Sequence, residues 1–174
     1  YASYGVGHAP RAGEQLTGLS PDNQDLQPEK FINYELGLKW LVREGLEASA
    51  ALYRLDRGNA AATGSTSDTQ VLVDGQRTHG LELSLAGHWR PGWHVMGAYT
   101  WQDSRVRTTL SPAAPAGASM PHVPRHSFAL WNRVTLGARW AAGLGITLRG
   151  AVFTSTDNTV RLPGYARVDA ALFY

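Results

Sequence analysis

The sequence predicts an all-β protein whose antiparallel strands run up and down through a membrane as part of a β-barrel. Three observations lead to this prediction. Apolar and polar residues alternate with a period of two in segment after segment, charged residues keep to one side of that alternation, and short and long connections take turns along the chain. A membrane-spanning helix needs a run of about 18 or more apolar residues, and the sequence contains no such run.

The clearest strand pair is a hairpin joined by the tight turn 90–92, whose sequence is Arg-Pro-Gly. On one parity of the first segment lie aliphatic residues such as Leu81 and Leu83, and the other parity holds small and polar residues. The same alternation recurs in further segments, so we expect about eight strands. The expected strands are residues 1–6, 34–40, 47–53, 80–89, 93–102, 127–136, 144–152 and 167–174.

Charged side chains fall on the polar parity of these strands. In a large barrel that parity lines a polar lumen, and the aliphatic parity meets hydrocarbon. Asn132 departs from the pattern, which a bulge or a position near the interface could explain. We expect Glu82, Arg133, Arg149, Arg167 and Asp169 to form a structural network of charges and no ligand site. The full set is Glu35, Lys39, Glu47, Glu82, Arg133, Arg149, Arg167 and Asp169.

Connection lengths and aromatic residues indicate how the strands are oriented. Short turns follow Trp40, Trp89 and Leu136, whereas the long connections are residues 7–28, 56–69, 104–124 and the stretch after Phe153. Outer-membrane barrels have short periplasmic turns and long outer loops. Aromatic residues on the apolar parity mark both ends of the strands, as expected at headgroup level. They are Trp40, Trp89, Trp93 and Tyr174 at the short-turn end, and Tyr34, Tyr99 and Trp101 at the long-loop end.

Composition and motifs narrow the function. The net charge is +2 with scattered basic residues, so we expect no nucleic-acid partner. The chain has no cysteine, and its 6 histidines do not show a metal-binding spacing. His88 and His94 flank a turn and could approach each other, most simply as polar lumen residues. No catalytic residues, metal site or cofactor are therefore predicted, and the protein is not expected to be an enzyme.

Several segments resemble TonB-dependent siderophore receptors in order and spacing. Residues 28–39, with Pro-Glu-Lys at the start and Asn-Tyr-Glu-Leu-Gly-Leu-Lys at the end, are similar to the "PEKS-NYELGLK" strand of that family. The resemblance covers nearly the whole chain. The other matching pieces are residues 1–4, 50–56, 77–83, 91–93, 98–100, 123–127, 130–131, 162–165 and 167–169.

The resemblance implies a barrel of about 22 strands in the bacterial outer membrane with a plug domain inside it. Residues 1–174 are then part of the barrel domain, the plug is absent from them, and the chain is a fragment. The implied partners are a ferric siderophore, outer-membrane lipid and the TonB complex, which acts through the plug. Iron is expected only as part of the ligand.

Two other interpretations stay open. A complete small eight-stranded barrel with a structural or adhesive role also fits about eight strands. A soluble all-β binding module fits less well, because the leucine-rich faces would need a partner sheet.

Ligand contacts are expected from inward residues near the long-loop end and from the loops, because arginine and aromatic side chains can hold anionic, flat ferric complexes. Replacing Arg105 or Tyr53 with Ala is therefore expected to weaken siderophore binding. The candidate contacts are Tyr53, Gln102, Arg105, Phe153, His122 and His126.

Overall fold

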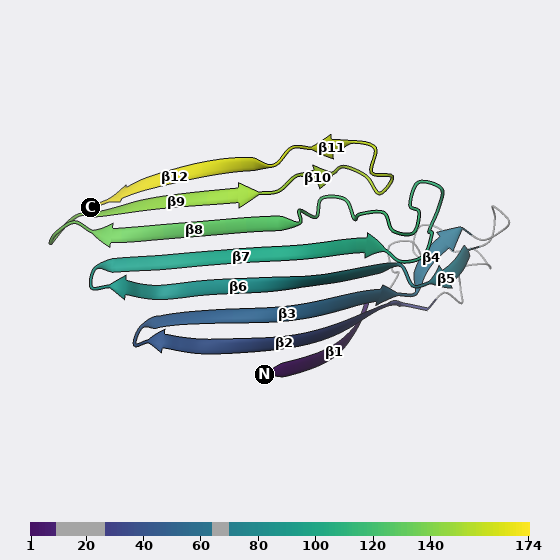
Figure 1. The fold of residues 1–174 in the computed structure, drawn as a ribbon, viewed down its shortest axis with the longest axis horizontal. Coiled ribbons are helices and arrows are strands. Elements are labelled where there is room, and N and C mark those ends of the chain that lie inside the picture. Colours follow the sequence, from purple (N-terminus) through teal and green to yellow (C-terminus); the bar gives the residue numbers. More distant parts are fainter. Residues whose placement is uncertain (10–26, 64–69) are drawn as a thin grey trace.

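The computed structural model describes residues 1–9, 27–63 and 70–174, and it contains one antiparallel sheet of eight strands (Figure 1). The strands lie side by side in the order in which they occur in the chain, with β1 and β12 at the edges, which is the up-and-down arrangement predicted. The strands are β1 (Ala2–Ala9), β2 (Glu29–Arg43), β3 (Leu46–Gly58), β6 (Gln76–Arg90), β7 (Trp93–Val106), β8 (His126–Thr135), β9 (Ala141–Arg149) and β12 (Tyr165–Phe173).

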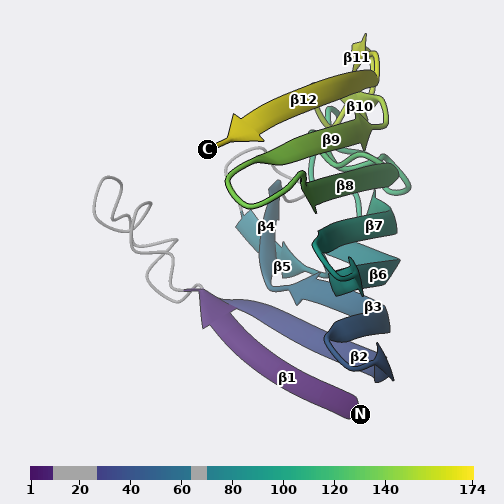
Figure 2. The same ribbon diagram turned by 90° about the vertical axis from the view of Figure 1, so that its left-hand side faces the viewer.

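The sheet is a single open layer. Figure 2 shows its strands following an arc, with β1 at one edge and β12 at the other. These two edge strands do not pair with each other in the described part of the chain, so the eight strands do not close into a barrel of their own. The alternative of a complete eight-stranded barrel is therefore not supported. A curved open layer is the shape expected of a piece of a wider barrel wall.

All eight predicted strands are present, but several boundaries differ. β7 continues to Val106, into the expected loop 104–124, because residue after residue stays paired with β6 up to the pair of Gln76 and Val106. β9 ends at Arg149 rather than at residue 152. The amide of Gly150 still donates to the carbonyl of His126 at 2.8 Å, and the chain then leaves the sheet.

Two small hairpins extend from long connections. β10 (Val152–Phe153) pairs with β11 (Arg161–Leu162), and β4 (Ala60–Thr63) pairs with β5 (Gln70–Val73). Part of the expected loop 56–69 is therefore strand. Residues 10–26 and 64–69, which belong to two of the expected long connections, lie outside the described residues.

The short connections lie together at one end of the sheet and the long ones at the other (Figure 1), as predicted. Gly45 and Gly92 each take a φ of 74° in the two tightest turns, a conformation that favours glycine. The register shifts beside both turns, between Leu41 and Arg43 and between His88 and Arg90. Such bulges are typical where a hairpin bends tightly.

In the described part of the chain, no layer covers the aliphatic face of the sheet. Leu36, Leu38 and Val168 are 62%, 63% and 67% exposed, and the fully packed apolar side chains in the described residues are few. A contiguous exposed apolar face of this kind marks a surface that meets lipid or a partner. This arrangement does not fit a soluble binding module.

In the described part of the chain, no helix has the length and hydropathy required to cross a membrane.

Aromatic side chains mark both ends of this apolar face. Trp40, Trp89 and Tyr174 are exposed at the short-turn end, and Tyr34 is exposed at the long-loop end. Trp140, which the sequence analysis did not include, lies against Tyr174 with ring centroids 4.7 Å apart.

Asn132 is accommodated on the apolar face without a bulge. The pairing of β8 with both of its neighbours is continuous through this residue. The indole Nε1 of Trp93 donates to the Asn132 Oδ1 at 3.0 Å. The amide oxygen is thus satisfied by a neighbouring aromatic side chain, as a polar group on an apolar surface requires.

An arginine at the centre of the apolar face should be costly. Leu83 pairs with Ala50 and Tyr99 in the middle of this face, and Ser84 is its neighbour on the opposite face. In the intact protein in a lipid bilayer, Leu83→Arg should lower the free energy of unfolding by about 2–4 kcal/mol, because the guanidinium is placed in hydrocarbon. The control Ser84→Arg should change it much less. Equal losses for the two variants, measured by denaturant unfolding in vesicles, would contradict the lipid-facing assignment.

Candidate functional site

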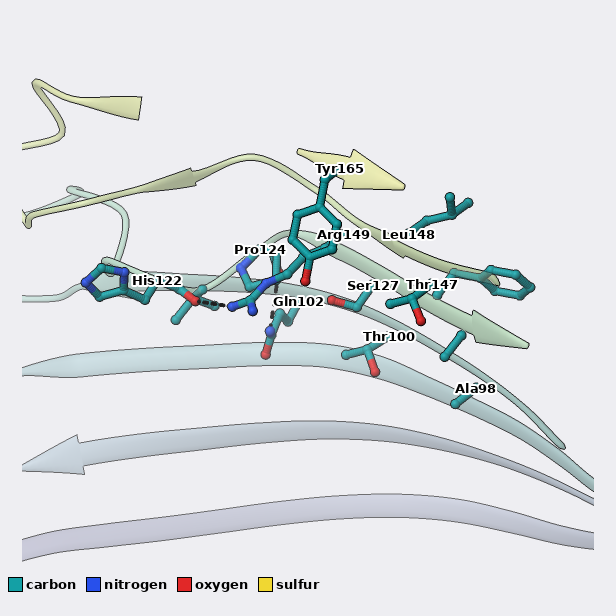
Figure 3. Close-up of a pocket in the computed structure, with 13 residues that line it drawn as sticks. Ala98, Thr100, Gln102, His122, Pro124, Ser127, Thr147, Leu148, Arg149 and Tyr165 are labelled. Carbon is teal, nitrogen blue, oxygen red and sulfur yellow. Dashed lines mark hydrogen bonds between the residues drawn. The ribbon is translucent and has the colours of Figure 1, made fainter. Parts of the chain in front are cut away.

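The polar face of the sheet is hollowed near the long-loop end by a cavity of about 480 Å³ (Figure 3). Four of its lining residues form one straight row, because the register pairs each with the next across β7, β8, β9 and β12. These residues are Thr100, Ser127, Arg149 and Tyr165. The row presents two hydroxyls, a guanidinium and a phenol to one space.

Hydrogen bonds hold the loop before β8 against this cavity. The Gln102 Nε2 donates to the carbonyl of Pro124 at 3.2 Å, and the Arg149 Nη2 donates to the carbonyl of His122 at 3.1 Å. Figure 3 shows both bonds reaching from strand side chains to the loop. His122 itself takes a φ of 60°, which places a non-glycine residue in the left-handed region at the point where the loop is held.

Tyr53 supports this tether from two strands away. Its hydroxyl donates to the Gln102 Oε1 at 3.1 Å, so the amide of Gln102 is oriented with its nitrogen toward the loop. Gly80 lies between the two residues in the register. A Cβ there would come within 2.8 Å of the Tyr53 ring and 2.6 Å of the carbonyl oxygen of Trp101. The glycine therefore permits the tyrosine ring to lie across β6 and reach β7.

The cavity has the chemistry of a site for an anionic or strongly polar ligand. Arg149 is the one Arg or Lys among its lining residues, and none of them is Asp or Glu. A guanidinium has five N–H donors, and within the described residues one hydrogen bond engages them, the bond to the loop carbonyl. The remaining donors and the nearby hydroxyls can bind oxygen atoms of a ligand.

The six predicted contact residues divide into two groups. Gln102 and His122 line the cavity, and Tyr53 is bonded to Gln102. The inward orientation expected for Arg105 is wrong. β7 runs to Val106 without a bulge after Gly92, so Arg105 has the parity of Trp101 and lies on the apolar face.

His126 also belongs to the apolar face. It is the first residue of β8 rather than a loop residue, and its Nδ1 lies 2.8 Å from the hydroxyl of Tyr99. With Arg105 and Phe153 it lines a second cavity, of about 550 Å³, beside the β10–β11 hairpin. That any of the six residues contacts a ligand stays a prediction.

Sequence reasoning missed the row across the cavity. Arg149 was expected to belong to a structural network of charges with Glu82, Arg133, Arg167 and Asp169. Among these five residues the structure shows one ion pair, between Arg167 and Asp169 at 2.9 Å. Arg149 instead bonds to the loop, and Arg133 lies over the ring of Phe173, 5.3 Å from its centroid. The polar parity of Arg149 was visible in the sequence, but its level relative to Gln102 depends on the register.

The predicted approach of two histidines, His88 and His94, at the short-turn end of the sheet is confirmed. His88 and His94 are register partners with ring centroids 3.8 Å apart, as the sequence suggested. Within residues 1–9, 27–63 and 70–174, no group of three or more His, Cys, Asp or Glu side chains is placed to hold a metal ion.

Comparison with known proteins gives a consistent result. The family model described as "TonB dependent receptor-like, beta-barrel" matches residues 1–174. The catecholate siderophore receptor Fiu of Escherichia coli K12 is 30% identical over 185 residues, which cover 100% of this chain and 24% of that protein. The probable TonB-dependent receptor BfrD of Bordetella pertussis is 29% identical, with 100% of this chain and 25% of that protein covered.

Solved structures agree with the fold. The closed form of Fiu from Escherichia coli K12 superimposes with a TM-score of 0.84 at 30% identity, over 98% of this chain and 26% of that one. The siderophore receptor PiuA from Acinetobacter baumannii gives a TM-score of 0.85 at 25% identity, with the same coverage of 98% and 26%. The chain therefore spans about a quarter of the length of the relatives it matches.

The tether through Gln102 can be tested by a change of one atom. A glutamate at this position still accepts from Tyr53 but cannot donate to the Pro124 carbonyl, so Gln102→Glu should loosen the loop. Loss of one hydrogen bond, about 1 kcal/mol, corresponds to about fivefold faster hydrogen–deuterium exchange of the amides in residues 120–126.

The matched control is Gln76→Glu. Gln76, in β6, lies on the same face of the sheet as Gln102, but its Nε2 donates to the side-chain hydroxyl of Ser104 at 3.0 Å and not to a loop carbonyl. Its replacement should leave exchange in residues 120–126 unchanged. Equal protection of the loop in the wild type and in Gln102→Glu would show that the tether does not hold it.

Proposed function

Because the chain belongs to the TonB-dependent receptor β-barrel family, whose members lie in the bacterial outer membrane, we propose that it forms part of the wall of a receptor that imports ferric siderophores. The observation that carries this proposal is the cavity on the polar face at the long-loop end, with Arg149 and a row of hydroxyls aimed into it. The similarity to the catecholate siderophore receptor Fiu and to the probable siderophore receptor PiuA supports the same class of ligand.

The proposed receptor uses this site as one side of a binding surface. A ferric siderophore arrives from the side of the long loops, which the family places outside the cell. Arg149 attracts an anionic complex, and the hydroxyls of Thr100 and Ser127 bind its oxygen atoms. Tyr53 and Gln102 act as positioning residues, because they hold the loop at Pro124 over the cavity.

We also propose how residues 1–174 relate to the whole receptor. All of them belong to the barrel domain, and energy from TonB reaches the ligand through a plug domain outside these residues. Iron enters as part of the cargo, and no step of the proposed transport is catalysed by a residue of this chain.

The charge of Arg149 provides the main test. In the intact receptor, Arg149→Gln should weaken binding of a ferric catecholate complex by about tenfold or more, because a hydrogen bond to a charged group contributes about 1.5–3 kcal/mol. Quenching of tryptophan fluorescence during titration measures the affinity.

Arg133→Gln is the matched control. Arg133 has the same polar parity but lies near the short-turn end, where it pairs with His94 and Gly143 in the register. This variant should bind as the wild type does. An Arg149→Gln receptor with unchanged affinity would remove this cavity from the binding surface.

A further inference from the structure

Four arginines form a belt on the apolar side of the sheet, above the aliphatic residues. Arg54, Arg77 and Arg105 have the same parity as the apolar residues of β3, β6 and β7, but lie nearer the long-loop end. Arg125 joins them through an ion pair with Asp103. The arginine belt is defined as Arg54, Arg77, Arg105 and Arg125, together with the carboxylates Asp56 and Asp103.

Aromatic side chains lie at the level of the belt and directly below it. The guanidinium of Arg54 lies 5.8 Å from the ring centroid of Tyr34. The rings of His79 and Trp101 are 5.6 Å apart. Tyrosine and tryptophan gather where hydrocarbon gives way to headgroups, so the belt lies at headgroup level, outside the membrane-spanning part of the strands.

The belt has more cations than anions. Asp56 is shared between Arg54 at 2.6 Å and Arg77 at 2.5 Å, and Asp103 is shared between Arg105 and Arg125, each at 3.0 Å. Partial burial alone would raise the pKa of Asp103, but hydrogen bonds from the two arginines outweigh it and lower the pKa below its usual range. Each aspartate therefore stays ionised, and each cluster keeps one positive charge in excess.

The second cavity, of about 550 Å³, continues the belt toward the β10–β11 hairpin. Arg105, Arg125 and Arg161 all line it, together with His126. No Asp or Glu is among its lining residues. Asp103, which pairs with Arg105 and Arg125, balances one of these three charges, so the guanidinium groups around this space keep an excess of two positive charges that an anion with several oxygen atoms can balance.

We propose that the arginine belt and this cavity bind the phosphate groups of lipid headgroups in the outer leaflet. Guanidinium groups pair with phosphate through parallel N–H···O bonds, and arginine is suited to such contacts. Lipid is the occupant because the aliphatic face directly below the belt holds acyl chains, so a phosphorylated lipid satisfies both surfaces at once. The proposal rests on the place of the family in the membrane and is independent of what the receptor imports.

The intact receptor, purified in non-ionic detergent, can be titrated with phosphatidic acid and with phosphatidylcholine of the same acyl chains. Native mass spectrometry then counts the bound lipids. Phosphatidic acid should bind more tightly than phosphatidylcholine, and the double variant Arg105→Gln, Arg125→Gln should weaken its binding by about tenfold or more. The variant Arg105→Lys, Arg125→Lys keeps both charges, so its affinity for phosphatidic acid should fall by a smaller factor. If the glutamine variant does not fold, the comparison of this lysine variant with the wild type tests the proposal.

Arg167→Gln is a matched control on the opposite face. Arg167 pairs with Asp169 two residues later, as Arg54 pairs with Asp56, but it belongs to the polar parity. Its replacement should leave lipid binding unchanged. Inorganic phosphate at the same concentration should not displace the lipid. Equal binding of the two lipids, unchanged binding by both double variants, or displacement by inorganic phosphate would each overturn the proposal.

Discussion

The structure depends on the pairing of backbone amides and carbonyls between neighbouring strands. In hydrocarbon these groups cannot bond to water, so a chain that crosses a membrane as strands must pair each of them with a neighbour. Pairing fixes the register, and the register fixes which side chains stand in one row. The cavity row from Thr100 to Tyr165 and the arginine belt are both products of this constraint, one on each face of the same sheet.

The two faces serve separate purposes because neighbouring residues of a strand point in opposite directions. In β7, Gln102 contributes to the polar face and holds the loop, and the next residue, Asp103, contributes to the opposite face and binds two arginines. A single-layered sheet can therefore carry a ligand-binding surface on one face and a lipid-facing surface on the other, at the same level along its strands. Neither surface requires a hydrophobic core behind it.

Much of the fold could be predicted from the sequence, because a strand between lipid and a polar lumen must alternate. The alternation fades where the strands leave the membrane, since both faces then meet polar surroundings. This explains why the ends of β3 and β7 were assigned to loops, and why Arg105 was expected to point inward although the unbroken register places it outward. Arg149 was missed for another reason. Its polar parity was evident, but the five-residue turn before β9 leaves its level relative to Gln102 open until the pairing is known.

The pairing of each strand with its sequence neighbours also bears on how such a wall is formed. β2 and β3 are joined through Glu44 and Gly45, and β6 and β7 through Pro91 and Gly92, so the first pairs of each hairpin are only a few residues apart in the chain. Contacts between residues close in sequence form quickly, because little chain entropy is lost in closing them. Closing the pairs within a hairpin therefore costs less chain entropy than closing the pairs that join one hairpin to the next across a long connection.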